Sequence, residues 1–125
     1  MPFKCLSNQI ATERYDYTLA VGENLLLPVK ARRDEVVIIL GISVYNNTQN
    51  GFTLLYKVMQ RRGRVFRIDY LAALATGVVH LFDHDLYLID GDESGIALTP
   101  SAAGDTVQVT MQYMRLRDDE YFKAT

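Results

Sequence analysis

The 125-residue chain contains no tryptophan, three prolines and one cysteine. A single cysteine, Cys5, cannot form a disulfide within the chain, so the fold does not depend on an internal cross-link. No apolar run approaches the roughly 18 residues of a membrane-spanning helix, and the N-terminal residues lack the apolar segment of a secretion signal. These absences predict a soluble protein that is made in the cytoplasm, without a secretion signal or a membrane partner.

Catalytic motifs are also missing. The chain has no G-x-S-x-G sequence, P-loop, Rossmann glycine pattern or H-E-x-x-H motif. Cys5 lies in an unpatterned N-terminal stretch without a nearby histidine. The net charge of −2 contrasts with the basic excess of most nucleic-acid-binding domains. We therefore predict that the protein is not an enzyme and uses no cofactor, and nucleic acid is not an expected partner.

The chain does contain many short runs of β-branched and aromatic residues, separated by turn residues. Such runs predict strands, here near 9–21, 25–29, 35–45, 52–59, 65–68, 78–82, 84–89, 96–99 and 106–113. An alanine- and leucine-rich segment allows at most one short helix near 69–76. Seven to nine short strands predict an all-β, single-domain antiparallel β-sandwich over 9–117. An N-terminal arm, 1–8, and a C-terminal tail, 118–125, flank it.

The longest β-branched apolar run, 35–45, is predicted to be a strand whose first half is buried on both faces. An Asn50-Gly51 turn predicts that the run forms a hairpin with 52–59. The row predicted to face the core is Ile38, Leu40, Ile42 and Val44. Val37 and Ile39 begin the opposite row, where we expect the N-terminal strand or a neighbouring subunit.

The last predicted strand has the clearest alternation in the chain. Its apolar row, Val107, Val109, Met111 and Tyr113, alternates with threonine and glutamine, which predicts one core face and one polar face. The apolar phase then shifts by one residue at Met114. Such a shift indicates a bulge, a twist or a change of neighbour.

A local basic patch follows 52–59 and consists of Arg61, Arg62, Arg64 and Arg67, and acidic residues gather in the tail. Arginine can bind phosphate or the carboxylates of a neighbouring protein, although a turn of this kind can also simply be solvated. Asp118, Asp119 and Glu120 are predicted to be counter-charges of the turn across a subunit boundary. The predicted subunit or partner interface comprises Val37, Ile39, Arg61, Arg62, Arg64, Asp118, Asp119, Tyr121 and Phe122.

Two segments have residues that can bind metals, but neither has the pattern of a metal site. His80 and His84 lie in a predicted strand-turn-strand, where a spacing of four does not bring two side chains together as it does on a helix. The acidic turn 90–94 lacks the closing glutamate of a helix-flanked calcium loop. We predict no metal site.

Four stretches carry a resemblance to a known family: Ile42-Ser43-Val44-Tyr45-Asn46-Asn47-Thr48, the aliphatic return strand 52–59, Leu86-Tyr87-Leu88-Ile89-Asp90-Gly91-Asp92, and 101–113, which reads SAAGDTVQVTMQY. Over about 35–117 the chain resembles the small jelly-roll proteins of tailed-bacteriophage virions. The resemblance implies a jelly-roll fold and a structural role in the virion, most simply as a capsid decoration (cement) protein. It also implies a symmetric homo-oligomer, with a trimer favoured, that contacts the major capsid protein or other virion proteins.

Two alternatives remain open. The first is an adaptor that anchors the head-tail, collar or fibre region of the same virion. The second is a receptor- or carbohydrate-binding β-sandwich module, which needs aromatic side chains around a shallow groove. The scattered candidates for that groove are Tyr56, Tyr70, Tyr87 and Tyr121.

Overall fold

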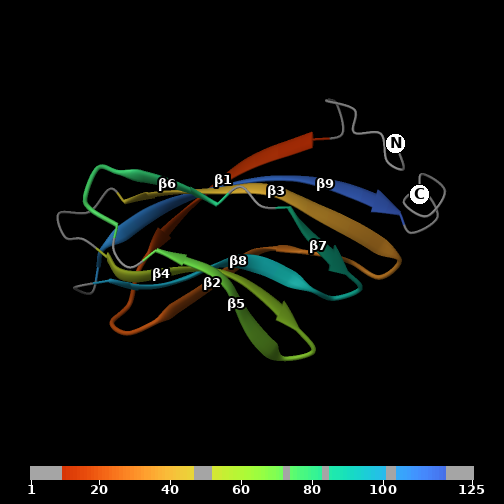
Figure 1. Ribbon diagram of the computed structural model, residues 1–125, viewed down its shortest axis with the longest axis horizontal. Helices are drawn as coiled ribbons and strands as arrows, with labels where there is room; N and C mark the ends of the chain where they lie inside the picture. Colours follow the sequence, from red (N-terminus) through yellow and green to blue (C-terminus); the bar gives the residue numbers. More distant parts are fainter. Residues whose placement is uncertain (1–9, 47–51, 72–73, 83–84, 101–103, 118–125) are drawn as a thin grey trace.

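The computed structural model describes residues 10–46, 52–71, 74–82, 85–100 and 104–117, which form two packed β-sheets (Figure 1). The strands of these residues are β1 (Ile10–Thr18), β2 (Asn24–Lys30), β3 (Glu35–Asn46), β4 (Phe52–Arg61), β5 (Arg64–Leu71), β6 (Val79–Phe82), β7 (Leu86–Ile89), β8 (Glu93–Pro100) and β9 (Thr106–Arg117). The predicted all-β sandwich is confirmed. The described part of the chain has no helix, and residues 69–71 of the segment considered for one belong to β5.

The two sheets have the strand order of a jelly roll. The β3 sheet runs β1-β9-β3-β6, with β7 also paired to β3, and the β4 sheet runs β2-β8-β4-β5. β6 pairs with residues 42–45 of β3 and β7 pairs with residues 36–39, so the two short strands occupy one edge in succession. Counted as one interrupted strand, they leave four antiparallel positions in each sheet, as in a double Greek key. The predicted jelly-roll architecture is confirmed.

The hydrophobic core lies between the two sheets. β9 contributes the row predicted from its alternation, since Val107, Val109, Met111 and Tyr113 are all buried there. The β4 sheet contributes Leu55, Ile96 and Leu98 from the opposite side, together with other members of the same cluster. The core is therefore a single layer of apolar side chains, as expected when two half-apolar sheets pack face to face.

A bulge in β3 changes which of its residues face this core. The register with β9 shifts between Ile39 and Gly41, which adds one residue, Leu40, on the β3 side. A one-residue insertion reverses the side-chain direction. The inward residues are consequently Val37 and Ile39 before the bulge and Ile42 and Val44 after it.

The predicted division of this strand is therefore wrong in its first half. Val37 and Ile39 are each 0% exposed within the core, so they have no surface to offer a neighbouring subunit. Their neighbours Val36 and Ile38 face outward instead, in a separate cluster with Met114 and Leu116. Hydrophobic alternation did not reveal the bulge, because both rows of this strand are aliphatic up to Leu40, and the available signal was Gly41, an isolated glycine inside a strand pattern.

The phase shift at Met114 of β9 has a different origin. β9 keeps a continuous register with β1 from Thr106 to Met114, so it contains no bulge at this point. Arg115 continues the inward row at the end of the sandwich, where its guanidinium donates to the Lys30 carbonyl at 2.9 Å and to Glu35 Oε1 at 2.6 Å. Side-chain direction therefore keeps its alternation at Met114, and what changes is polarity: Met114 and Leu116 are apolar on the outward side, where they cluster with Val36 and Ile38.

Close contact between β2 and β8 requires glycine at position 95. The β2–β8 register shifts between Leu26 and Val29, and Pro28 lies in this irregular part of an edge strand, where a missing N–H is tolerated. A Cβ atom built on Gly95 would lie 1.9 Å from the carbonyl oxygen of Leu26, far inside any permitted contact. No side chain rotation could relieve a clash with backbone.

We expect Gly95→Ala to destabilise the fold by about 3 kcal/mol or more, in the range of severe backbone or packing defects. Gly41→Ala is the matched control, because its Cβ would meet its nearest atom, in Leu81, at an ordinary 3.7 Å. The control should change the free energy of unfolding by less than about 1 kcal/mol. Urea denaturation measures both, and equal effects would contradict the assigned contact.

Candidate functional site

The outward face of the β3 sheet carries an apolar cluster where an antiparallel sandwich normally presents polar residues. Val36, Ile38, Met114 and Leu116 form it and are exposed by only 2%, 2%, 1% and 6%. Ile10 and Leu40 pack against them. We call these six residues the apolar outer face. It is a second hydrophobic cluster, on the side of the sheet away from the core, and its Val36, Ile38, Met114 and Leu116 side chains are buried.

The same outward side continues into an exposed apolar edge. Ile89 pairs with Val36 and Tyr87 with Ile38, and both β7 side chains are 49% exposed. On β6, Val79 and Leu81 are 56% and 58% exposed. We call Val79, Leu81, Tyr87 and Ile89 the edge stripe. Exposed apolar residues that adjoin a sheet edge are typical of a surface that binds another protein.

The remainder of the outward face is polar. A shallow hollow of about 230 Å³ lies there, lined by Thr12, Gly41, Ser43, Leu81, Thr110 and Gln112. In the register, Gly41 lies opposite Gln112, directly beyond the bulge. The apolar outer face therefore ends at the bulge, and only the edge stripe extends past it.

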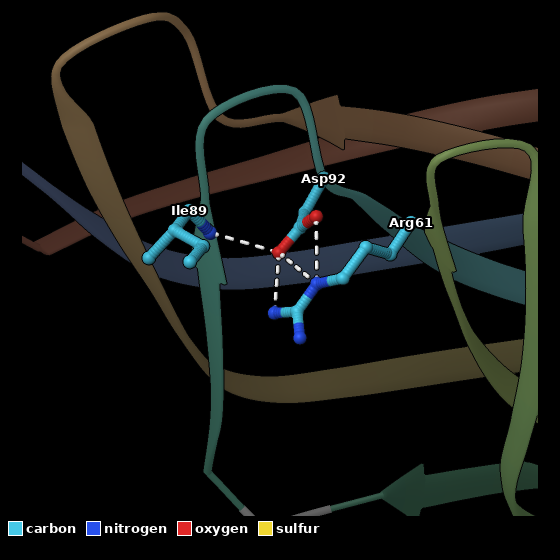
Figure 2. Close-up of polar contacts among 3 residues, drawn as sticks. All are labelled: Arg61, Ile89 and Asp92. Atoms are coloured by element: carbon cyan, nitrogen blue, oxygen red, sulfur yellow. Dashed lines mark hydrogen bonds and ion pairs between the residues drawn. The ribbon is translucent and has the colours of Figure 1, made fainter.

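An ion pair with a buried carboxylate closes the end of the sandwich at which β3 begins (Figure 2). Asp92 lies in the turn between β7 and β8, and its side chain is 3% exposed. Arg61, the last residue of β4, donates to it from Nε at 3.0 Å and from Nη2 at 2.7 Å. The Ile89 N–H donates to the same carboxylate at 3.0 Å. Three donors thus replace the water that burial removes from Asp92.

This pair changes the role predicted for Arg61. The prediction paired Arg61 with acidic tail residues across a subunit boundary, whereas its observed partner is Asp92 of its own chain. Hydrogen bonding and charge attraction to Asp92 raise the pKa of Arg61, so the guanidinium stays charged. Sequence analysis missed Asp92 as a partner because the two residues are 31 positions apart.

We expect Asp92→Ala to destabilise the protein by about 2–3 kcal/mol, since it leaves the Ile89 N–H and a half-buried guanidinium without their acceptor. Asp16→Ala is the matched control, because Asp16 also pairs with an arginine, Arg14, but with both side chains about 60% exposed. That change should cost about 0.5 kcal/mol or less. If urea denaturation gave equal losses in the free energy of unfolding for the two variants, burial of Asp92 would add nothing to stability.

The other predicted arginines remain at the surface. Arg62 and Arg64 are exposed in and beside the β4–β5 turn. Arg67, further along β5, pairs with Glu23 and lies 5.4 Å from the centre of the Tyr56 ring. Asp118, Asp119, Tyr121 and Phe122 lie outside the described residues.

A polar cluster on β1 and β9 groups Glu13 with two tyrosines. The Tyr15 hydroxyl donates to Glu13, and this bond is the largest of the causes that lower the Glu13 pKa, with Tyr113 contributing a second bond. Burial is the main cause that raises the pKa values of Tyr15, Tyr113 and the adjacent Tyr17. The pKa of Glu13 and the pKa values of the tyrosines are all shifted away from neutral pH. Near neutral pH Glu13 is therefore ionised and the tyrosines are protonated, so the cluster lacks a group suited to proton transfer.

The raised tyrosine pKa values predict a loss of stability in alkali. When a folded pKa lies above the unfolded one, its contribution is complete below the unfolded value, here 10.0, and is lost as the pH rises. We expect the free energy of unfolding to fall progressively above about pH 10 as the unfolded tyrosines ionise. Denaturation at a series of pH values, with phenolate absorbance as the second signal, checks this. Tyr17→Phe should weaken the dependence, and an unchanged slope would contradict the assignment.

The aromatic and histidine candidates do not form one site. Tyr56 and Tyr70 lie together on the β4 sheet, with ring centres 5.9 Å apart, whereas Tyr87 is on the β3 sheet. Tyr121 lies outside the described residues. His80 packs edge-on against Phe82 at 4.5 Å, and His84 lies outside the described residues.

Within the residues that the structure describes, no group of three or more histidine, cysteine, aspartate or glutamate side chains is placed to bind a metal ion. No helix of sufficient length and apolarity to cross a membrane is found in the part of the chain that the structure describes.

Comparison with known proteins gives a match in structure but not in sequence. No protein-family model matches the chain, and no curated protein matches it. The structure is similar to a solved chain of Bacillus endospore appendages, which are described as a novel family of disulfide-linked pili. The TM-score is 0.51 at 16% sequence identity, and the match covers 92% of this chain and 96% of the other. The similarity supports the jelly-roll sandwich as the fold of the chain.

Proposed function

We propose that this protein is a non-enzymatic structural subunit that assembles with copies of itself. The observation that carries the proposal is the edge stripe, whose four apolar side chains are about half exposed. Tyr87 and Ile89 are each 49% exposed, and the exposed part of these apolar side chains would be covered by a second copy packed on the same sheet. Symmetric association is the usual way in which a small domain buries such a surface.

The fold similarity supports a structural role in one further respect. The similar chain comes from appendages described as pili, which are assemblies of protein subunits. Their description as disulfide-linked cannot apply to this chain in the same form. A disulfide uses one cysteine from each partner, so a chain with Cys5 alone can be cross-linked to only one other copy. Any longer array of this chain would depend on non-covalent contacts.

The location of this assembly is a finer proposal. The sequence resemblance to tailed-phage jelly-roll proteins favours a virion, with capsid decoration as the leading role and a head-tail, collar or fibre adaptor as the alternative. A jelly roll is shared by proteins of many functions. The fold therefore agrees with a location in the virion but does not select it. The major capsid protein would then be the second partner.

We expect the double variant Tyr87→Lys/Ile89→Lys to remain folded but to lose self-association, because two buried charges would oppose the packing of a second copy. Val21→Lys is the matched control, since Val21 is 81% exposed and lies outside both named apolar surfaces. Sedimentation velocity measures the mass, and thermal denaturation checks the fold. A fully monomeric parent protein, or a double variant that assembles like the parent, would overturn the proposal.

Electron microscopy of the purified protein separates the possible locations. Filaments or rings formed by the protein alone favour an appendage-like polymer. Binding to phage shells that lack the protein, with a rise in their melting temperature, favours capsid decoration. Glycan binding by a monomer that neither self-associates nor binds shells would instead establish the carbohydrate-binding alternative.

A further inference from the structure

Three turns meet at the end of the sandwich where β3 begins and β9 ends (Figure 1). The β2–β3 turn contacts the β7–β8 turn, since the Ala31 N–H donates to the Asp92 carbonyl at 2.8 Å and the Gly91 N–H donates to the Ala31 carbonyl at 2.9 Å. Arg61 joins the β4–β5 turn to the same place through the Asp92 carboxylate. Residues far apart in the sequence therefore form one surface.

This end carries an excess of positive charge. The exposed arginines of the three turns are Arg32, Arg33, Arg62 and Arg64. No ion pair of the described residues involves the side chains of these four. We call them the arginine end.

The acidic groups nearby do not cancel this charge. Asp92 forms an ion pair with Arg61, and Glu35 forms one with Arg115. Glu93 lies opposite Lys30 in the strand register. The acidic residues left in these turns are Asp34 and Asp90. Four arginines against two aspartates leave two positive charges in excess, on a chain whose net charge is −2.

A hollow of about 430 Å³ opens beside these arginines, lined by Arg61, Arg62, Ile89, Asp90 and Asp92. Its volume is in the range of sites that accept small groups. The Asp92 carboxylate, neutralised by Arg61, does not repel an incoming anion as a free carboxylate would. Arg62 lies at the tip of the turn with a left-handed φ of 51°, and its exposed guanidinium can bind a carboxylate with two parallel hydrogen bonds.

We propose that the arginine end binds the acidic tail residues Asp118, Asp119 and Glu120 of a second copy of the chain. These three consecutive carboxylates directly follow Arg117, the last residue of β9, which ends at this same end of the sandwich. Two arginine ends that approach one another repel. Acidic tails exchanged between the two copies turn that repulsion into attraction. This inference rests on the proposed self-association and names the contact that gives it specificity.

Charge-swapped variants test the proposal. Arg62→Glu/Arg64→Glu and Asp118→Arg/Asp119→Arg should each weaken self-association at least tenfold, measured by sedimentation equilibrium at low ionic strength. An equimolar mixture of the two variants should associate again, because each offers the other a complementary tail. The loss should shrink at high salt, which screens exposed charges. Arg14→Glu/Arg67→Glu is the control for Arg62→Glu/Arg64→Glu, with the same change in net charge, at exposed arginines that pair elsewhere.

Each contrary outcome has a distinct meaning. If a single chain carrying all four charge swaps associates again but the mixture does not, the tail contacts its own copy and the proposal fails. If the charge variants associate like the parent while Tyr87→Lys/Ile89→Lys does not, the proposed function stands and only the tail contact fails. A parent that is monomeric throughout would overturn the proposed function itself.

Discussion

The buried carboxylate of Asp92 is the interaction on which the end of this sandwich depends. Desolvation makes such a group costly unless every lone pair finds a donor, and Arg61 and the Ile89 N–H supply the donors from β4 and β7. The same residue binds the β2–β3 turn through its backbone. One side chain thus positions both the last residue of the edge stripe and the turn that carries Arg62.

The two candidate surfaces are consequently parts of one arrangement. The edge stripe offers exposed apolar area, which does not by itself fix the orientation of a partner because the hydrophobic effect is non-directional. The arginine end adds charge, which selects partners and sets their orientation more than it adds affinity. The proposed self-association would need both properties, since an assembly must be stable and must also repeat one geometry.

Strand content and the core row of β9 could be predicted because side-chain direction in a strand has period two, and β9 shows that period in its sequence. The candidate site was less accessible. Val37 and Ile39 were assigned to the wrong face because aliphatic residues fill both rows of β3, so no polar residue marks the bulge at Leu40. Arg61 was assigned the wrong partner because a sequence shows neighbours along the chain and not across turns.

The amino-acid sequence alone therefore determined the class of structure: an all-β sandwich of short strands, without a cross-link within the chain or a catalytic motif. These properties follow from local composition and alternation. Tertiary structure decided which apolar row lies inside, which carboxylate neutralises Arg61, and which arginines stay exposed at the end of the sandwich. Those outcomes depend on strand register and on contacts between distant turns, and a single inserted residue at Leu40 is enough to exchange the inner and outer faces of β3.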